Sequence, residues 1–236
     1  MLVGRQHGIG LRHRIKNCLD KLPMTAQSPS PGAGYSTGDI DAAVPGNGLG
    51  FVYVAVCAGP EDILKVGLSH DPLARWSAFH RRWFEAFDLD QSLLLQTETR
   101  RDAQALETAL HRLLRDHNCA APMTMRDQFG GGTEWYRGAY GTALEFARAA
   151  ARQGHVLHPS ARAWFAHAMR GRADTLAGLL DQAMREMAAG VMTPAQLDAL
   201  NDLIDAHRAF DEDIPARFST ELAMLSRLKA ELWPRV

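Results

Sequence analysis

Four side chains in the middle of the chain could together act on a phosphodiester: Tyr53, Lys65, Arg75 and Glu107. A tyrosine hydroxyl is a weak base at its reference pKa of about 10, but a neighbouring cation helps it to accept a proton from an attacking water. Lys65 could be that cation, or it could hold a phosphate as a point charge. The Arg75 guanidinium could stabilise a pentacovalent transition state, and the Glu107 carboxylate could hold a divalent cation.

Two predicted strands would position Tyr53 and Lys65. Residues 51–56 and 63–68 are runs rich in aromatic and β-branched residues, with a glycine–proline pair between them. This pattern predicts two antiparallel strands. Alternate residues of a strand share a face, so both polar ends could lie at one edge of the sheet. A core tyrosine and an edge lysine whose ammonium reaches solvent would fit the pattern equally well.

A helix that begins after Asp71 would carry Arg75. Asp71 is a typical N-cap, and Pro72 follows it at the first helical position. Large apolar residues then recur near the helical period as far as Phe87. Arg75 falls roughly opposite the stripe that contains two tryptophans, so it can face a catalytic side, although alone it could be a surface arginine. His80 lies on the apolar stripe, which favours a core histidine over a catalyst.

A third strand and a second helix are expected next. The strand should span residues 92–97, and Thr99 with an acidic residue three positions later resembles a capping box that opens a helix. Glu107 lies at the border of the apolar stripe of this helix, from where its carboxylate can reach a cleft. The alternative is a solvent-facing pair of Glu107 with His111 at i, i+4, which would contribute only about 0.3 kcal/mol.

The order of these motifs resembles the GIY-YIG nuclease superfamily. Residues 50–53 read Gly-Phe-Val-Tyr, where the first family motif ends in its tyrosine. Residues 65–67 read Lys-Val-Gly at the second motif, so a lysine replaces the second tyrosine. Residues 134–136 read Glu-Trp-Tyr, which is similar to the Glu-Trp-Phe-like element of the phage and bacterial branch whose second motif is Lys-Ile-Gly.

The resemblance implies a fold and an activity. The fold would be α+β, a small three-stranded antiparallel sheet flanked by helices and followed here by an all-helical region. The activity would be metal-dependent endonuclease hydrolysis of nucleic-acid phosphodiester bonds, with DNA favoured as the substrate. The alternative is a non-catalytic nucleic-acid-binding or protein-interaction module on the same scaffold, which the lysine at position 65 leaves open.

The resemblance also implies residue roles. Tyr53, Lys65 and Arg75 would be catalytic. Glu107 would hold Mg²⁺ or another divalent cation, for which one carboxylate with water and substrate is chemically adequate.

Two further residues are implied to bind nucleic acid or to support the site, Asn118 and Glu134. A zinc site is not expected, because the spacing of His111, His117 and Cys119 matches no common set of zinc ligands.

Composition limits the classes of protein and partner. The chain has 236 residues, of which 46% are hydrophobic, enough for the core of one large or two small domains. Its formal net charge of −1 does not indicate a polybasic nucleic-acid binder, so any such contact must be local. Three distant cysteines without a Cys-x-x-Cys pair favour the reducing cytoplasm. No apolar run reaches the roughly 20 residues that span a bilayer, so no membrane partner is expected.

Three regions are expected along the chain. Residues 1–49 would be a flexible basic arm and linker, which could touch a phosphate backbone or remain a solvated tail. Residues 50–140 would form the GIY-YIG-like nuclease domain, and residues 141–236 a helical domain that could self-associate or bind a protein partner. Strand signals vanish beyond Tyr140. Helical stretches are expected at residues 141–153, 160–188, 194–208 and 215–232.

Overall fold

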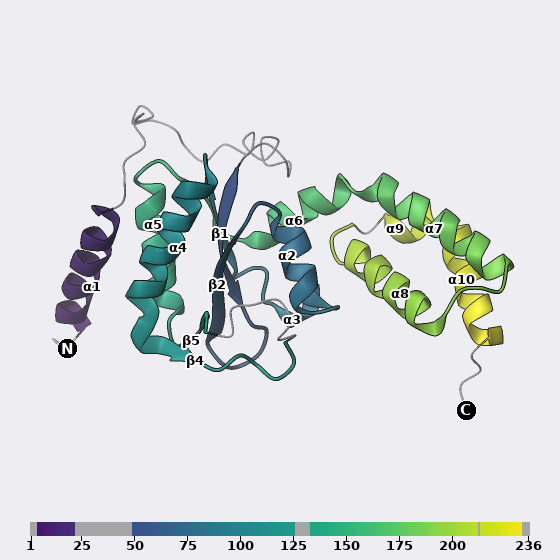
Figure 1. The fold of residues 1–236 in the computed structure, drawn as a ribbon, viewed down its shortest axis with the longest axis horizontal. Coiled ribbons are helices and arrows are strands. Elements are labelled where there is room, and N and C mark those ends of the chain that lie inside the picture. Colours follow the sequence, from purple (N-terminus) through teal and green to yellow (C-terminus); the bar gives the residue numbers. More distant parts are fainter. Residues whose placement is uncertain (1–3, 22–48, 126–132, 212, 233–236) are drawn as a thin grey trace. The chain divides into compact units, whose positions relative to one another are not determined.

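The computed structural model of the protein describes residues 4–21, 49–125, 133–211 and 213–232 (Figure 1). The chain forms two compact units, Met1–Trp164 and Phe165–Val236. Most of the expected linker and the glycine run before Glu134 lie outside the described residues. Within the described parts, no helix is both long and apolar enough to cross a membrane.

The first unit contains a six-stranded antiparallel sheet with strand order β4-β5-β2-β1-β3-β6. Its strands are β1 (Gly50–Val56), β2 (Ile63–Ser69), β3 (Leu93–Thr97), β4 (Asn118–Cys119), β5 (Trp135–Arg137) and β6 (Val156–His158). The three expected strands are its centre, and the α+β class is confirmed. The expected three-strand count was wrong, as was the absence of strands beyond Tyr140, because the added strands have only two or three residues and show no periodicity.

Helices cover both faces of this sheet (Figure 1). In the first unit they are α1 (Gly4–Leu19), α2 (Pro72–Phe79), α3 (Trp83–Ala86), α4 (Arg100–Leu114) and α5 (Tyr140–Ala151), with a short 3-10 helix at Arg115–His117. The two predicted N-caps are confirmed: the Asp71 side chain accepts a hydrogen bond from the Ala74 amide, and Thr99 accepts one from the Asp102 amide.

The amphipathic helix expected from Leu73 to Phe87 is interrupted at His80. His80 has an extended backbone, and its Nδ1 accepts a hydrogen bond from the Arg82 amide at 3.1 Å. The imidazole is half-buried and fixes the turn between α2 and α3. The apolar period continues across the break because both helices bury residues against the same face of the sheet.

Alternating strand residues divide the core between two layers. Val52 and Val54 of β1 pack with α4 and α5, whereas Tyr53 points to the other face, toward aromatic rings of α2. Phe51 also lies on that face, where its ring contacts Trp164 at a centroid distance of 5.3 Å. The side chains of β1 and β2 that face α2 therefore leave the sheet on the face opposite to the one on which α4 packs.

The N-terminal arm is not simply a flexible tail, because residues 4–19 form α1. Ile15 and Leu19 are 3% and 4% exposed and belong to the same core as α4 and α5. The Cys18 thiol donates a hydrogen bond to the Ala109 carbonyl of α4 at 3.5 Å. The expectation of a solvated arm was wrong for this segment, because tertiary burial of a few apolar residues stabilises a helix whose sequence is otherwise basic.

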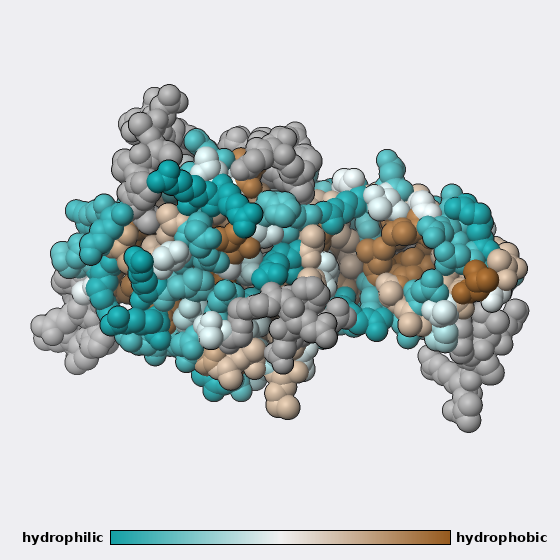
Figure 2. All heavy atoms as spheres, viewed as in Figure 1, coloured by the Kyte–Doolittle hydropathy of each residue, from teal (hydrophilic) through white to brown (hydrophobic). Residues whose placement is uncertain are grey.

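The second unit is helical. Its elements are α6 (Ala161–Arg170), which begins in the first unit, α7 (Ala173–Ala188), α8 (Pro194–Arg208), α9 (Ile214–Arg217) and α10 (Ser219–Leu232). The helix expected at 160–188 is thus two helices, and that expected at 215–232 is also divided. Its core includes Leu176, Leu180 and Ile204, whereas Leu179 and Met224 are exposed. Figure 2 shows hydrophobic surface on this unit.

Candidate metal centre and catalytic cluster

Tyr53 is buried in the α2 face of the sheet, with an exposed fraction of 0%. Its ring packs edge-on against Trp76 and Phe79, at centroid distances of 6.0 and 6.1 Å. Burial raises the pKa of Tyr53 to about 12, which the nearby Arg75 guanidinium opposes. The hydroxyl has no hydrogen-bond partner within the described residues. Near neutral pH, Tyr53 is therefore a neutral phenol whose hydroxyl lies beside the Arg75 guanidinium.

Gly67 gives Tyr53 the space that it occupies. The two residues are direct neighbours across β1 and β2. A Cβ atom at position 67 would collide with the Tyr53 hydroxyl and would lie 2.6 Å from Cζ. The glycine of the Lys-Val-Gly motif is thus required by close packing, since any side chain there would displace the phenol.

Lys65 lies on the same face as Tyr53 and is 1% exposed. Its ammonium forms an ion pair with Glu134 Oε2 at 2.9 Å and lies 5.2 Å from the centroid of the Trp135 ring. Burial lowers the pKa of Lys65, while the hydrogen bond that Lys65 donates to Glu134 raises it. The alternative of an edge lysine that reaches solvent is wrong, because this ammonium lies beside the Phe79 and Trp135 rings and pairs with the Glu134 carboxylate.

Arg75 projects from α2 toward the same cluster. Its guanidinium carbon lies 5.0 Å from the centroid of the Phe79 ring. It lowers the pKa of both Tyr53 and Lys65, which places its charge near both groups. Its Nε atom is buried and has no hydrogen-bond partner in the described part of the chain. Arg75 therefore holds a fixed positive charge and a spare donor beside the Tyr53 hydroxyl.

Glu107 comes from α4, which packs on the opposite face of the sheet from α2. It is 9% exposed, and its Oε2 accepts a hydrogen bond from Gln104 Nε2 at 2.7 Å. Its Oε1 lies 3.8 Å from His111 Nε2, one helical turn further on. The pair expected at i, i+4 exists, but both side chains face inward, so it is not the solvent-facing surface pair.

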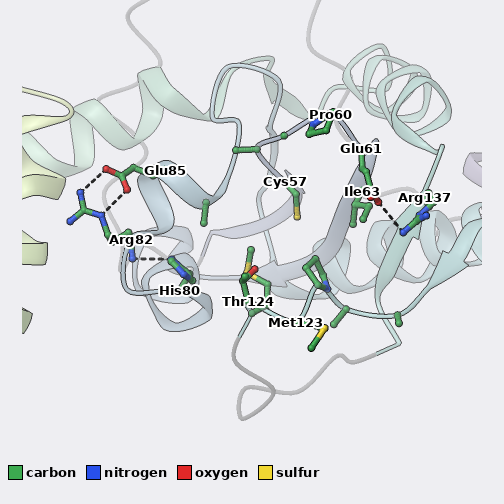
Figure 3. Close-up of a pocket in the computed structure, with 17 residues that line it drawn as sticks. Cys57, Pro60, Glu61, Ile63, His80, Arg82, Glu85, Met123, Thr124 and Arg137 are labelled. Atoms are coloured by element: carbon green, nitrogen blue, oxygen red, sulfur yellow. Dashed lines mark hydrogen bonds and ion pairs between the residues drawn. The ribbon is translucent and has the colours of Figure 1, made fainter.

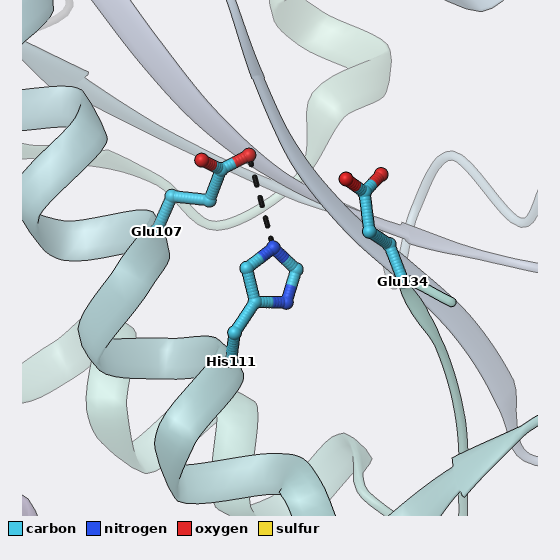
Figure 4. Close-up of side chains that lie close together, drawn as sticks. All are labelled: Glu107, His111 and Glu134. Carbon is cyan, nitrogen blue, oxygen red and sulfur yellow. Dashed lines mark ion pairs between the residues drawn. The ribbon is translucent and has the colours of Figure 1, made fainter. Parts of the chain in front are cut away.

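Glu134 connects the two groups of side chains. Figure 4 shows it facing Glu107 and His111 across the site, and one donor atom from each of the three lies within 4.8 Å of the others. Glu134 also forms the ion pair with Lys65. The charges of both glutamates raise the pKa of Tyr53. The structure thus brings Tyr53, Lys65 and Arg75 together with the two glutamates. The connecting residue is Glu134, which directly precedes β5 and pairs with Lys65 of β2.

Asn118 positions the segment that carries Glu134. Its Nδ2 donates hydrogen bonds to the carbonyls of Thr133 and Trp135, the latter at 3.1 Å. These carbonyls belong to the residues on either side of Glu134 in the sequence. Asn118 is itself exposed, and its observed contacts fix the backbone of the β5 strand.

The sequence analysis did not identify Gln104 as a supporting residue, considered His111 only as a zinc ligand or as the surface partner of Glu107, and gave Tyr136 no role beyond the Glu-Trp-Tyr element. The Tyr136 hydroxyl lies 2.6 Å from His111 Nδ1, and burial raises the pKa of Tyr136 to about 12. A signal for His111 was present in the sequence, because a glutamate and a histidine at i, i+4 lie on one helix face. That spacing brings metal ligands together in other helical sites. His117 and Cys119 do not join this group.

A separate pocket of about 810 Å³ lies beyond the end of β1 (Figure 3). Cys57, Ile63 and His80 contribute to its lining, together with residues 120–125. Its charged side chains largely pair with one another, since Arg82 contacts Glu85 at 2.6 Å and Arg137 contacts Glu61 at 2.9 Å. It contains none of the six expected site residues, so the cavity and the chemical cluster are different features.

Taken together, an antiparallel α+β sheet and an inward-facing Glu, His and Glu group define a domain with a candidate metal centre. Residues 50–151 match the family model of the T5orf172 domain, a family commonly described as GIY-YIG-like. No curated protein and no solved structure gives a significant match to the chain.

Proposed function

We propose that the first unit is a divalent-cation-dependent endonuclease that hydrolyses phosphodiester bonds of nucleic acid, with DNA as the first substrate class. One observation carries the proposal. Glu134 pairs with Lys65 on one side and lies within 4.8 Å of donor atoms of Glu107 and His111 on the other. Cationic side chains that could bind a phosphate and a candidate cation site are therefore adjacent, an arrangement that would favour phosphodiester hydrolysis.

The donor set fits a divalent cation. Glu107 and Glu134 offer carboxylate oxygens, which are ligands of hard cations, and His111 adds an imidazole nitrogen. These three residues would hold the ion. A divalent cation bound there would neutralise the charge that develops on the leaving oxygen and would orient the phosphate.

The other side chains have distinct proposed tasks. Arg75 would donate from its unpartnered, buried Nε to a phosphate oxygen and stabilise the extra charge of the transition state. Lys65 would hold Glu134 in place and add a second positive charge. The Tyr53 hydroxyl would hold the attacking water, and proton acceptance by Tyr53 depends on the charge of Arg75.

The direct test is a time course of the purified full chain with supercoiled plasmid and with single-stranded DNA, in Mg²⁺, Mn²⁺ or EDTA. We expect nicking or cleavage with a divalent cation and none in EDTA. Binding to the same substrates is measured in parallel as a function of salt. Salt-sensitive binding without cleavage under any of these conditions would replace the proposal by a non-catalytic binding module.

A pH profile tests the role of Tyr53. If tyrosinate is the proton acceptor, its fraction rises about tenfold per pH unit below a pKa of about 12. The cleavage rate at saturating DNA and cation should therefore rise by about 100-fold from pH 7 to pH 9 without a plateau. Tyr53→Phe should be slower and lose this slope. A plateau above pH 7 in the parent protein would instead indicate an acceptor that titrates near neutrality.

Replacing Lys65 by methionine separates charge from packing. Methionine keeps an unbranched apolar stem beside Phe79 and Trp135, and Glu134 is 32% exposed, so water can solvate its unpaired carboxylate. We expect a change in unfolding free energy of less than about 1.5 kcal/mol, with cleavage at least about tenfold slower. Denaturant unfolding and single-turnover cleavage measure the two effects. Lys16→Met on α1 is the control, and an equally slow rate in that variant would argue against a local effect.

A further inference from the structure

Each of the three candidate ligands is held by a second side chain. Glu107 accepts a hydrogen bond from Gln104, and Glu134 accepts one from Lys65. His111 Nδ1 lies 2.6 Å from the Tyr136 hydroxyl. Outer contacts of this kind orient metal ligands and fix the tautomer of a ligating histidine.

The remaining donor atoms of these residues face one another (Figure 4). The 3.8 Å between Glu107 Oε1 and His111 Nε2 exceeds a hydrogen bond. It lies between the separations of about 3.0 and 4.2 Å that neighbouring and opposite ligands have around an ion at about 2.1 Å. A small movement of the side chains would therefore bring both atoms to one ion. Lys65 donates to Oε2 of Glu134 at 2.9 Å, and a turn of this carboxylate would bring one of its oxygens to the same point.

We propose that Glu107, His111 and Glu134 form a mixed carboxylate and imidazole centre that takes Mn²⁺ or a similar transition-metal ion in preference to Mg²⁺ or Ca²⁺. This inference rests on the proposed function, in that it names the ion of the same site. Imidazole nitrogen is a good ligand for transition metals, whereas Mg²⁺ and Ca²⁺ favour oxygen. A site with one carboxylate alone would show no such preference for nitrogen-accepting ions.

Tyr136 is the positioning residue of this centre. To bind an ion through Nε2, His111 must carry its proton on Nδ1. The Nδ1–H group then donates to the Tyr136 oxygen along the 2.6 Å contact. Without the tyrosine hydroxyl, His111 would still be present as a ligand, but its tautomer and its ring orientation would no longer be fixed.

The test is direct ion binding by the full chain, measured with isothermal calorimetry for Mn²⁺, Mg²⁺ and Ca²⁺ separately. We expect Mn²⁺ to bind at least about tenfold more tightly than Mg²⁺. Electron spin-echo spectra of the Mn²⁺ complex should show coupling to an imidazole nitrogen. His111→Ala should abolish that coupling and weaken Mn²⁺ binding by about 10- to 100-fold, with a change of less than about threefold for Mg²⁺.

Three further variants separate a ligand from a structural role. Tyr136→Phe should keep the nitrogen coupling but weaken Mn²⁺ binding by about tenfold. Glu134→Gln should weaken Mn²⁺ binding while His111 is unchanged, so the proposal stays testable even if His111→Ala does not fold. His117→Ala is the matched control, because its Nδ1 contacts the Arg137 carbonyl outside the ligand group, and it should bind Mn²⁺ as the parent does.

The inference and the proposed function can fail separately. Mn²⁺ binding with nitrogen coupling but no cleavage of any substrate would sustain the metal centre and overturn the nuclease. Cleavage that depends on Glu107, with no nitrogen coupling and the same ion preference in His111→Ala, would do the reverse. Absence of Mn²⁺ binding to the parent protein, or equal affinity for Mn²⁺ and Mg²⁺, would overturn the mixed centre.

Discussion

Glu107→Gln is expected to reduce cation-dependent cleavage by on the order of 1000-fold while the protein remains folded. Glutamine has the same shape and can still accept the hydrogen bond from Gln104, but it removes the negative charge that faces His111. Lys65 and Arg75 would then outweigh Glu134 in the cluster, so a divalent cation would be repelled. Single-turnover cleavage and calorimetric Mn²⁺ titration should both show the loss, with an unchanged circular dichroism spectrum.

Glu145→Gln provides the matched control for Glu107→Gln. Glu145 lies on α5, where it pairs with Arg148 at 3.0 Å on the surface. The same chemical change there should leave cleavage within about twofold of the parent rate, because exposed pairs contribute little. Full activity of Glu107→Gln would remove the proposed metal centre from the mechanism, whatever the outcome for the other residues.

The parts of the fold that the sequence predicts well are those with strong local signals. Thr99 and Asp71 cap α4 and α2 as expected, because a capping side chain needs only backbone amides a few residues away. The central strands were found because their apolar runs extend over five to seven residues. These predicted elements are the ones that carry Tyr53, Lys65, Arg75 and Glu107.

The missed elements depend on contacts that the local sequence does not encode. Strands β4, β5 and β6 exist because neighbouring strands offer free backbone groups for pairing, not because of their own pattern. Helix α1 depends on burial of Ile15 and Leu19 against helices far along the chain. Propensity and periodicity cannot report such long-range stabilisation.

The candidate site shows the same division. The order of the motifs identified Glu107 and Glu134 as candidate site residues. It did not predict the Lys65–Glu134 ion pair, which joins residues 69 positions apart. His111 was set aside as a zinc ligand because its spacing from His117 and Cys119 matches no common set of zinc ligands. The relevant neighbours are Glu107 on the same helix face and Glu134 on a different element. Helical phase was the informative signal.

Gly67→Ala is expected to destabilise the protein strongly. The new Cβ would collide with the Tyr53 hydroxyl and lie 2.6 Å from Cζ and 3.1 Å from Cε2. Tyr53 cannot withdraw easily, because it is fully buried between Trp76 and Phe79. We expect a loss of at least about 1–3 kcal/mol in unfolding free energy, as for other overpacked cores, measured by urea unfolding.

Gly141→Ala is the control for Gly67→Ala, since a Cβ at this position in α5 meets no atom within 4 Å. Adding a methyl group there should leave stability unchanged or raise it by up to about 1 kcal/mol, because alanine favours helix. If Gly67→Ala were as stable as Gly141→Ala, the close approach of Tyr53 to β2 would be incorrect.

A double-mutant cycle identifies Tyr53 as the source of the strain. Tyr53→Phe removes only the hydroxyl, so Gly67→Ala should stay strongly destabilising in that background because Cζ remains in place. Tyr53→Leu removes the far end of the ring, so Gly67→Ala should cost clearly less there, with a coupling energy of at least about 1 kcal/mol. Additive effects in the leucine background would mean that position 67 tolerates no side chain for another reason. If Gly67→Ala is strongly destabilising with tyrosine or phenylalanine at position 53 but not with leucine, the glycine of the motif determines where the ring of Tyr53 lies.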